Sequence, residues 1–343
     1  MDRVSPGSES SRPVRVGTRA SLLARTQTEW FVARLRGLGH AVEVETISTQ
    51  GDSRSDVPIA AIGGDGVFVR ELERALLDGR IDAAVHSLKD MPTAETPGLE
   101  VACVPIRATP FDVLVAREAC TLESLPAGAI VGTSSVRRVA QVRALRHDLV
   151  IRPLRGNVDT RLRRLDAGDY DCLVLAGAGL ERLSLGHRVT HVLRPDAFWP
   201  AVSQGALAVQ IRGDDARLRA ALRPLDDAAT HRAVRAERSC LAALAGGCLA
   251  PIGGWARDAA DGRLVLGACV LEIGGDTVHR VAAEASTAIR AEVRRAVSAE
   301  AEARDEAEAL GAADALGRHV AALLLAQGAD LMLARMRSGA TES

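Results

Sequence analysis

Lysine and aromatic residues are nearly missing from this sequence. Its 43 lysine and arginine residues include a single lysine, Lys89, and only 2% of all residues are aromatic. Proteins that bind single-stranded nucleic acid stack the bases on aromatic side chains, so this scarcity argues against that class. The formal net charge of -1 also argues against a general nucleic-acid binder, although it leaves room for a local basic cleft. We therefore expect no nucleic-acid partner.

Paired cysteines and long apolar runs are absent as well. The six cysteines contain no C-x-x-C pair, so neither a zinc site nor a disulfide framework is indicated, and a reducing cytoplasm is the expected compartment. No run approaches the ~18 apolar residues of a membrane helix. Residues 1–13 have no apolar core and are expected to be a disordered tail, not a signal peptide. We expect no metal and no membrane partner.

The order of the apolar patterns predicts two α/β lobes followed by a smaller α+β domain. Strand and helix patterns alternate over residues 14–85, and the alternation restarts after Pro105 and Pro110, which predicts mainly parallel sheets. Residues 206–211 alternate like a strand that returns to the first lobe. Further on, a helix over 228–245, strands over 264–271 and 277–283, and a helix over 307–327 are expected. Residues 299–308 are expected to be a solvated acidic helix face.

The single lysine lies in the stretch Val85-His86-Ser87-Leu88-Lys89-Asp90-Met91-Pro92. A strand pattern over residues 81–85 runs into this polar cluster, and Pro92 stops it. Ligands bind at the carboxyl ends of strands in open α/β sheets, so Lys89 and Asp90 are candidate site residues. A surface turn with an exposed Lys–Asp pair is the alternative, since such pairs are common and contribute little to stability.

Arginines are concentrated between residues 133 and 164. This segment holds nine arginines and two aspartates. Thr133, Ser134 and Ser135 stand at a predicted helix N-terminus beside Arg137 and Arg138. Helix N-termini and guanidinium groups both bind anions, so a site for phosphate or carboxylate is predicted here. A solvated arginine-rich face is the alternative.

Two more strand-to-helix junctions repeat this arrangement. Arg155 and Arg161 flank the turn at Gly156-Asn157. Near the start of the chain, Arg19 precedes Ser21, which is expected to cap a helix that continues to about residue 36. Junctions of this kind on two lobes predict a cleft for a ligand that carries several negative charges.

Cys248 lies in a glycine-rich loop, Gly246-Gly247-Cys248, after a predicted helix. The glycines leave its sulfur accessible, and Arg238 on that helix is placed to lower the pKa of the thiol and make it nucleophilic. The cysteines inside strand or helix patterns are expected to be small buried hydrophobic residues, and Cys120 to be a loop thiol. The buried set is Cys103, Cys172, Cys240 and Cys269.

Eight motifs follow one another along the chain. They are Gly17-Thr18-Arg19-Ala20-Ser21, Thr49-Gln50-Gly51-Asp52, Gly66-Val67-Phe68-Val69-Arg70-Glu71-Leu72-Glu73, His86 to Pro92, Gly132 to Arg138, Arg155-Gly156-Asn157, Gln204-Gly205-Ala206 and Gly246-Gly247-Cys248. By these motifs in this order, the chain resembles the porphobilinogen deaminase family, also called hydroxymethylbilane synthases, over residues 14–254.

The resemblance implies an architecture and a reaction. Two lobes of the type II periplasmic-binding-protein kind are expected at residues 14–105 with 205–224 and at 106–204, followed by an α+β cofactor-attachment domain with a helical extension at 225–343. Enzymes of this family join four porphobilinogen molecules head to tail and release ammonia. They then hydrolyse the chain to hydroxymethylbilane, an intermediate of tetrapyrrole and heme biosynthesis. A monomeric transferase is expected.

The resemblance also implies roles for single residues. Asp90 is the expected catalytic carboxylate, and Cys248 the attachment point of a dipyrromethane cofactor through a thioether. The residues expected to bind that cofactor are Phe68, Lys89, Thr133, Ser134, Ser135, Arg137, Arg138 and Arg161. Those expected to bind substrate are Arg19, Ser21, Arg155, Arg182 and Gln204.

The chain departs from the family pattern at four positions. Asp65 stands where a lysine is common, Ser203 where glycine is frequent, and Leu249 and Ala250 where Gln-Val usually follows the cysteine. The rival hypothesis is a non-catalytic two-lobed protein that binds a polyanion. Fold alone does not separate the two. The discriminating features are Asp90 beside Lys89 and the loop thiol of Cys248, which a mere binder has no need to place together.

Overall fold

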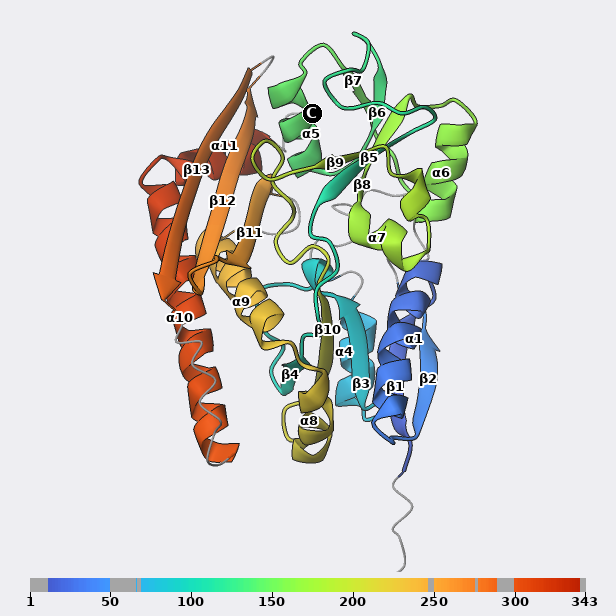
Figure 1. Ribbon diagram of the computed structural model, residues 1–343, viewed down its shortest axis with the longest axis vertical. Coiled ribbons are helices and arrows are strands. Elements are labelled where there is room, and N and C mark those ends of the chain that lie inside the picture. Colours follow the sequence, from blue (N-terminus) through green and yellow to red (C-terminus); the bar gives the residue numbers. More distant parts are fainter. Residues whose placement is uncertain are drawn as a thin grey trace, which may run out of the picture.

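The computed structural model of the chain describes residues 12–49, 66, 69–245, 250–274, 277–288 and 299–339. Within these residues the strands form two five-stranded sheets and one three-stranded sheet. Figure 1 shows the first sheet below the second, with the third standing along both of them. The expected fold class, two α/β lobes with a smaller C-terminal α+β domain, is confirmed. The domain boundaries stay a prediction, and the expected tail lies almost wholly outside the described residues.

The first lobe is a mixed sheet with strand order β2-β1-β3-β10-β4. β1 is parallel to β2 and β3, whereas β10 is antiparallel to β3 and β4. Four of the five strands therefore run in one direction, as the prediction of a mainly parallel sheet requires, and β10, which returns from the second lobe, runs against them. The elements are β1 (Val14–Arg19), α1 (Leu22–Gly37), β2 (Val42–Ile47), α4 (Arg70–Leu77), β3 (Ala83–Ser87), β4 (Leu99–Cys103), β10 (Leu207–Arg212) and α8 (Ala216–Leu222).

Helix α1 shows how local sequence builds this lobe. Ser21 caps it as predicted, since its hydroxyl oxygen accepts a hydrogen bond from the Ala24 N–H at 3.3 Å. Apolar residues at helical spacing, among them Phe31 and Leu35, pack against Val16 of β1 in one buried cluster. The helix thereby fixes the carboxyl end of β1, where Arg19 lies, against the sheet.

The second lobe repeats the plan with strand order β7-β6-β8-β5-β9. β6 is parallel to β7 and β8, while β5 is antiparallel to β8 and β9. This sheet is mixed for the same reason, because β5 enters from the first lobe. The elements are β5 (Asp112–Ala116), β6 (Ile130–Gly132), α5 (Val136–Leu145), β7 (Val150–Arg152), α6 (Val158–Asp166), β8 (Cys172–Ala176), α7 (Gly177–Arg182), the 3-10 turn η2 (Gly186–Arg188) and β9 (His191–Leu193).

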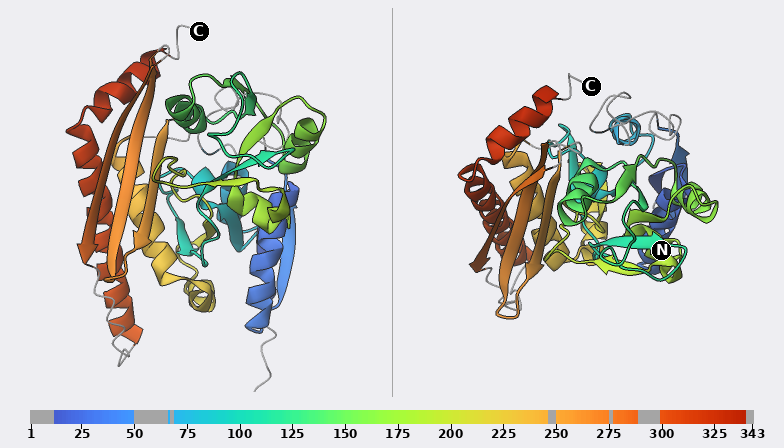
Figure 2. Two further views of the ribbon diagram at one scale, coloured as in Figure 1. Left: turned by 45° about the horizontal axis from the view of Figure 1, so that its top comes forward. Right: turned by 90° about the horizontal axis from the view of Figure 1, so that it is seen from above.

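The third unit packs helices on an antiparallel sheet of order β11-β12-β13. Its core joins buried side chains of α9, β11, β12, α10 and α11, and Figure 2 shows the sheet standing beside both lobes. Residues 304–308 of α10 are exposed, as expected for an acidic face. After the 3-10 turn η3 (Arg223–Leu225), the elements are α9 (Ala228–Ala243), β11 (Ile252–Asp258), β12 (Arg263–Gly274), β13 (Thr277–Ala288), α10 (Ala299–Leu325) and α11 (Ala329–Gly339).

Two segments, residues 104–111 and 194–206, cross between the lobes and lie backbone against backbone. The Ala108 N–H donates to the Gly205 carbonyl oxygen at 3.2 Å. Gly205 has a φ of +87°, and a Cβ there would lie 2.5 Å from the Thr109 carbonyl oxygen, so only glycine fits. Ser203 also has a positive φ, 60°, and its buried hydroxyl has no hydrogen-bond partner among the described residues. The family preference for glycine at this position therefore has a structural reason.

We expect Ser203→Gly to stabilise the protein by about 1 kcal/mol. Glycine removes the strain of the left-handed conformation at this position, which stabilises the folded state by ~1–2 kcal/mol. It also makes the unfolded chain more flexible, which destabilises the folded state by ~0.5–1 kcal/mol. Thermal unfolding should show a higher midpoint. Ser203→Ala is the control because it removes the hydroxyl but keeps the Cβ, and it should gain less. A lower midpoint for Ser203→Gly than for the wild type would contradict this account.

Glu237 of α9 ties both crossover segments to the third unit. Its carboxylate is fully buried. Arg107 of the first crossover donates to its two oxygens at 2.6 and 3.1 Å. The same carboxylate accepts from the Ser203 N–H of the second crossover and from the Ala256 N–H of β11 at 2.5 and 2.8 Å. One buried acid thus fixes the position of α9 against the point where the lobes meet.

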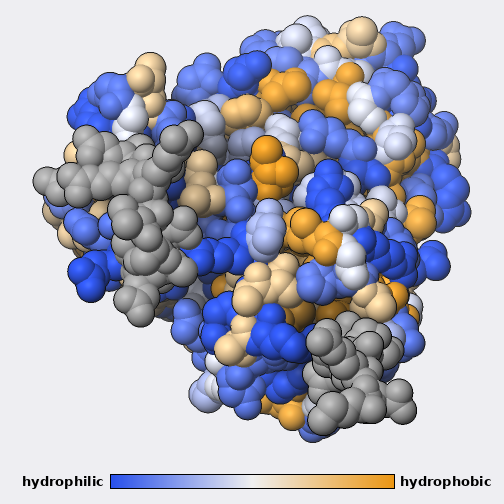
Figure 3. Space-filling view, turned by 60° about the horizontal axis from the view of Figure 1, so that its bottom comes forward, coloured by the Kyte–Doolittle hydropathy of each residue, from blue (hydrophilic) through white to orange (hydrophobic). Residues whose placement is uncertain are grey.

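Two further features concern the molecular surface and the apolar character of the helices. Figure 3 shows hydrophobic residues scattered among hydrophilic ones on the face in view, without a large continuous patch. Among the described residues, no single helix has the length and apolar character to cross a membrane; α10 and α11 meet that test only as a pair bent by 79°.

The described cysteines are all unpaired thiols, and the four expected to be buried are buried. Cys120 is partly exposed. Burial raises the pKa of Cys240 and of Cys172 to about 12, so these thiols stay protonated and unreactive near neutral pH.

Candidate active site

The candidate site begins where β3 leaves the first sheet. β3 extends through Ser87, two residues beyond its predicted end, and a single 3-10 turn, η1 (Leu88–Asp90), follows it. The Leu88 N–H donates to the Ala206 carbonyl oxygen at 3.1 Å, which holds the turn beside the second crossover. Lys89 and Asp90 therefore stand at the carboxyl end of a strand, as the sequence predicted.

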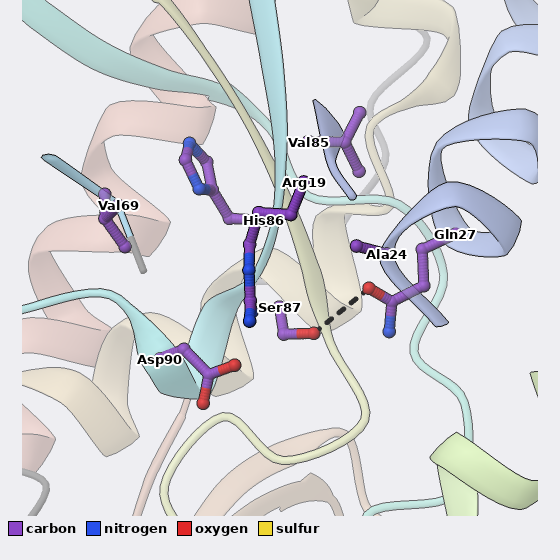
Figure 4. A pocket seen from close by; sticks show the side chains of 8 residues that line it. All are labelled: Arg19, Ala24, Gln27, Val69, Val85, His86, Ser87 and Asp90. Atoms are coloured by element: carbon purple, nitrogen blue, oxygen red, sulfur yellow. Dashed lines mark hydrogen bonds between the residues drawn. The ribbon is translucent and has the colours of Figure 1, made fainter. Parts of the chain in front are cut away.

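Asp90 borders a small cavity of about 10 Å³ that is also lined by Arg19, Gln27 and Ser87. Ser87 donates from its hydroxyl to the Gln27 amide oxygen at 3.1 Å, drawn as the dashed line in Figure 4. Within the described part of the chain, no hydrogen bond or ion pair engages the Asp90 carboxylate. The carboxylate is therefore available to a ligand in the cleft.

His86 lines the same cavity but is held neutral. Burial lowers its pKa to about 4, and a contact with Gln210 offsets this only in part. In Figure 4 its ring is turned away from Asp90. We therefore assign His86 no proton transfer at the Asp90 carboxylate.

Lys89 is connected across the crossover to the second lobe. Its ammonium donates to the Gln204 amide oxygen at 3.4 Å. The Gln204 amide nitrogen in turn donates to the Pro110 carbonyl oxygen at 2.8 Å and to Asp112 at 3.1 Å. Burial lowers the pKa of Lys89 to about 8, and Asp90 partly counteracts this. Gln204 is fully buried, so in this structure its contacts join the lobes; its predicted substrate contact stays a prediction.

Asp112, at the start of β5, holds Arg137 and Arg138 in a buried cluster. Arg137 donates to one carboxylate oxygen at 2.7 Å, and Arg138 donates to the other at 2.7 and 3.0 Å. Burial alone would raise the pKa of Asp112, but the two guanidinium groups lower it well below its usual value. Arg137 also donates to the Trp199 carbonyl oxygen and Arg138 to that of Val174. Both arginines thus bond to the protein itself, and their predicted contact with the cofactor stays a prediction.

The hydroxyl groups before α5 have different surroundings. Ser134 donates to the Leu154 carbonyl oxygen at 3.0 Å, and Thr133 accepts from the Ser135 N–H at 3.3 Å while 4% exposed. Ser135 stands at the N-cap of α5, yet its side chain makes no capping bond. Among these three residues, the Ser135 hydroxyl is the one best placed to meet an anion at the helix N-terminus.

Arg161 and Arg182 bring positive charge to the edge of the second lobe. Arg161 donates to the Gly156 carbonyl oxygen at 2.8 Å. Its pKa falls to about 10 through burial and the nearby charges of Arg138 and Arg155. Arg182 donates to the Gly205 carbonyl oxygen at 2.7 Å, and burial lowers its pKa to about 10. The positive charges of Arg138, Arg155 and Arg161 repel one another, and a bound anion would relieve this repulsion.

Several predicted residues cannot be placed. Phe68 and Cys248 lie outside the described residues, as do Asp65 and Leu249. The expectation that Arg238 acts on the Cys248 thiol is therefore untested. What the structure does show is that the Arg238 guanidinium donates to carbonyl oxygens of the Asp90 turn.

Sequence reasoning missed three residues that organise the site: Asp112, Gln27 and Glu237. Asp112 had a readable signal, since an acid at the start of the apolar run Asp112–Ala116 is expensive to bury without partners. Gln27 and Glu237 lie on helices with no comparable signal. A possible metal-ligand group occurs among the described residues at Asp226, His231 and Glu306, but it contains none of the site residues.

Comparison with known proteins extends the resemblance along the chain. A family model described as "Porphobilinogen deaminase, dipyromethane cofactor binding domain" matches residues 14–220. A second, "Porphobilinogen deaminase, C-terminal domain", matches residues 231–326. The likeness therefore reaches well beyond residue 254, the end of the resemblance found in the sequence.

Individual relatives are much more similar to this chain in sequence than the solved structures are. A porphobilinogen deaminase of Desulforudis audaxviator is 46% identical over 96% of this chain and 99% of its own. One of Acidothermus cellulolyticus is 46% identical over 93% of this chain and 91% of its own. A methionine-binding protein of solved structure covers 61% of this chain and 88% of its own, at 14% identity with a TM-score of 0.41. By the family models and the relatives, the chain belongs to the porphobilinogen deaminase family.

Proposed function

We propose that this chain is a porphobilinogen deaminase: it joins four porphobilinogen molecules head to tail with loss of ammonia and releases hydroxymethylbilane. The observation that carries the proposal is the Asp90 carboxylate, which makes no hydrogen bond or ion pair within the described residues and borders a cavity together with Arg19 and Ser87. A group of this kind can stabilise positive charge on a pyrrole while its carboxylates are bound nearby.

The cationic groups serve to bind carboxylates. Each pyrrole unit carries an acetate and a propionate, and guanidinium groups bind carboxylates through two parallel hydrogen bonds at any physiological pH. We propose Arg19, Arg155 and Arg182 for the incoming substrate. For the cofactor we propose Lys89, Thr133, Ser134, Ser135, Arg137, Arg138 and Arg161, together with Phe68.

The acid is proposed to act at the pyrrole nitrogen. Loss of ammonia from the aminomethyl group of porphobilinogen leaves positive charge shared between the methylene carbon and the ring nitrogen. Asp90 accepts a hydrogen bond from the ring N–H and stabilises that charge, and it can take up the proton lost after the new C–C bond forms. Lys89 keeps a carboxylate of the bound chain near the turn.

Dipyrromethane is proposed as a resident cofactor attached through a thioether to Cys248. The described residues fit such a group, because the cluster of Arg155, Arg161 and Arg138 concentrates positive charge and the Ser135 hydroxyl is not used for capping. When bound, the cofactor supplies the nucleophilic pyrrole carbon to which the first substrate is joined. The residues of the chain orient its carboxylates and exclude alternative positions of the growing product.

A non-catalytic polyanion-binding protein remains the second candidate, favoured by the positive charge that Arg138, Arg155 and Arg161 concentrate whether or not a reaction follows. We also propose a monomer in a reducing cytoplasm, which the unpaired cysteines support.

The test is intact-protein mass spectrometry of the purified protein, followed by a turnover assay. We expect an added mass of two linked pyrrole units on the wild type and on Cys120→Ser, but none on Cys248→Ser. With porphobilinogen, the wild type should release ammonia and hydroxymethylbilane in a ratio of four to one. Binding of porphobilinogen without ammonia release by a loaded protein would instead establish the binding-protein candidate.

A further inference from the structure

The turn that carries Lys89 and Asp90 is too short to hold itself in place. η1 is one 3-10 turn of three residues. The few hydrogen bonds within such a turn do not offset the conformational entropy that its backbone loses. On its strand side it is fixed by the bond from the Leu88 N–H to Ala206. On the opposite side, the Leu88 carbonyl oxygen accepts the Met91 N–H at 3.2 Å, whereas the carbonyl oxygens of Met91 and Pro92 need donors from elsewhere in the chain.

Arg238 of α9 supplies those donors. One terminal nitrogen of its guanidinium donates to the Met91 carbonyl oxygen at 3.2 Å and to that of Leu88 at 3.4 Å. The other donates to the carbonyl oxygen of Pro92. A planar guanidinium can bind several carbonyl oxygens in fixed directions, and its charge is favourable beside the carbonyl end of a turn. The guanidinium therefore bonds to the backbone on both sides of Asp90.

The same helix leads to the segment that contains Cys248. α9 ends at Ala243, five residues before Cys248 in the sequence. Its own position is fixed by Glu237, the neighbour of Arg238, through the crossover contacts described above. A displacement of α9 is thus transmitted to the Asp90 turn through Arg238.

We propose that Arg238 is a positioning residue: it holds the turn, and with it the Asp90 carboxylate, in place against α9 without touching substrate. The inference rests on the proposed function of Asp90. It assigns Arg238 a role at the Asp90 turn, which its two terminal guanidinium nitrogens contact.

A cavity of about 530 Å³ borders the turn and Arg238. It allows the positioning role of Arg238 to be tested by chemical rescue. It is lined by Leu88, Met91, Pro92, Arg235 and Arg238 among others. Truncation of Arg238 leaves its guanidinium site open to this cavity, so a guanidinium ion from solution can enter and bind the vacated carbonyl oxygens. Arg235 provides a matched control on the same helix and cavity wall, because its guanidinium bonds to Asp314 at 2.8 and 2.9 Å.

The experiment compares Arg238→Ala with Arg235→Ala, each first shown by mass to carry the cofactor. For Arg238→Ala we expect kcat to fall at least about tenfold with KM little changed, since Asp90 is displaced while carboxylate binding persists. Guanidinium chloride at low, non-denaturing concentration should restore kcat severalfold, whereas urea should not. Arg235→Ala should keep the wild-type kcat and show no rescue.

Hydrogen exchange supplies a readout that needs no substrate. In Arg238→Ala, exchange in peptides covering residues 86–93 should quicken, and guanidinium should slow it again. The inference would be overturned if Arg238→Ala kept the wild-type kcat, or if Arg238→Ala and Arg235→Ala lost kcat equally. It would also be overturned if hydrogen exchange at the turn were the same in Arg238→Ala and the wild type. An inactive wild type would count against the proposed function instead, while exchange would still decide the role of Arg238. If Arg238→Ala does not fold, Arg238→Lys takes its place with the same exchange criterion.

Discussion

Asp90→Asn is expected to lower kcat by about 10²–10⁴-fold, the range associated with loss of a positioned acid–base or charge-stabilising group. Asparagine keeps the shape of the side chain and one hydrogen-bond acceptor. It has no charge to stabilise a cationic pyrrole and no basicity to take up the released proton. The loss should fall on kcat more than on KM, because the residues proposed to bind substrate carboxylates are unchanged.

The control for this prediction is Glu95→Gln. Glu95 is an exposed acid five residues along the chain whose contact with Arg235 spans 3.5 Å, so its neutralisation should leave turnover unchanged. Mass spectrometry should show the cofactor on both variants, which separates loss of chemistry from loss of loading. A kcat for Asp90→Asn within tenfold of the wild type would remove Asp90 from the mechanism.

Local sequence patterns predicted the elements that carry the site. The end of β3, the cap of α1 by Ser21 and the hydroxyl groups before α5 all follow from short-range rules of strand ends and helix N-termini. These rules act over a few residues, so one sequence contains the information. The strands β4, β9 and β11 were missed because their apolar patterns are short or interrupted, and each depends on neighbours elsewhere in the chain.

The contacts within the site could not be predicted in the same way. The bond of Arg238 to Met91, 147 residues away, had no signal in the sequence. Arg137 and Arg138 were interpreted as open anion binders, yet Asp112 lies between them. Such partners are set by how the two lobes and α9 pack together, and local pattern does not encode that packing. The strand predicted over residues 206–211 does return to the first lobe as β10, but its alternating pattern did not indicate that even Gln210 would be buried.

Asp112→Ala is expected to destabilise the protein by about 3–5 kcal/mol, the cost of leaving buried charges without their partner. Arg137 and Arg138 are 4% and 7% exposed, so water cannot replace the lost carboxylate. Asp169→Ala is the matched control in the same lobe. Its partner Arg164 is 45% exposed, and its loss should cost at most about 1 kcal/mol.

The pH dependence of this loss has a definite sign. The folded-state pKa of Asp112 is lowered, so its stabilising effect is complete above its unfolded pKa of about 3.9 and declines as the pH falls toward the folded value. The difference between wild type and Asp112→Ala in denaturant unfolding should therefore be constant from about pH 5 to 8 and should narrow below about pH 4. An undiminished difference at the lowest pH would mean that the lost stability comes from packing and not from the ion pairs.

The same variant decides what Arg137 and Arg138 do in the loaded protein. If Arg137 and Arg138 also bind cofactor carboxylates, the cofactor partly compensates for the missing Asp112. The loss of unfolding free energy caused by Asp112→Ala should then be larger in a Cys248→Ser background than in the protein that carries the cofactor. Equal losses in the two backgrounds would show that the two arginines serve Asp112 alone. Carboxylate binding would then rest on the other proposed groups, among them Arg155, Arg161 and the Ser135 hydroxyl, since none of these bonds to Asp112.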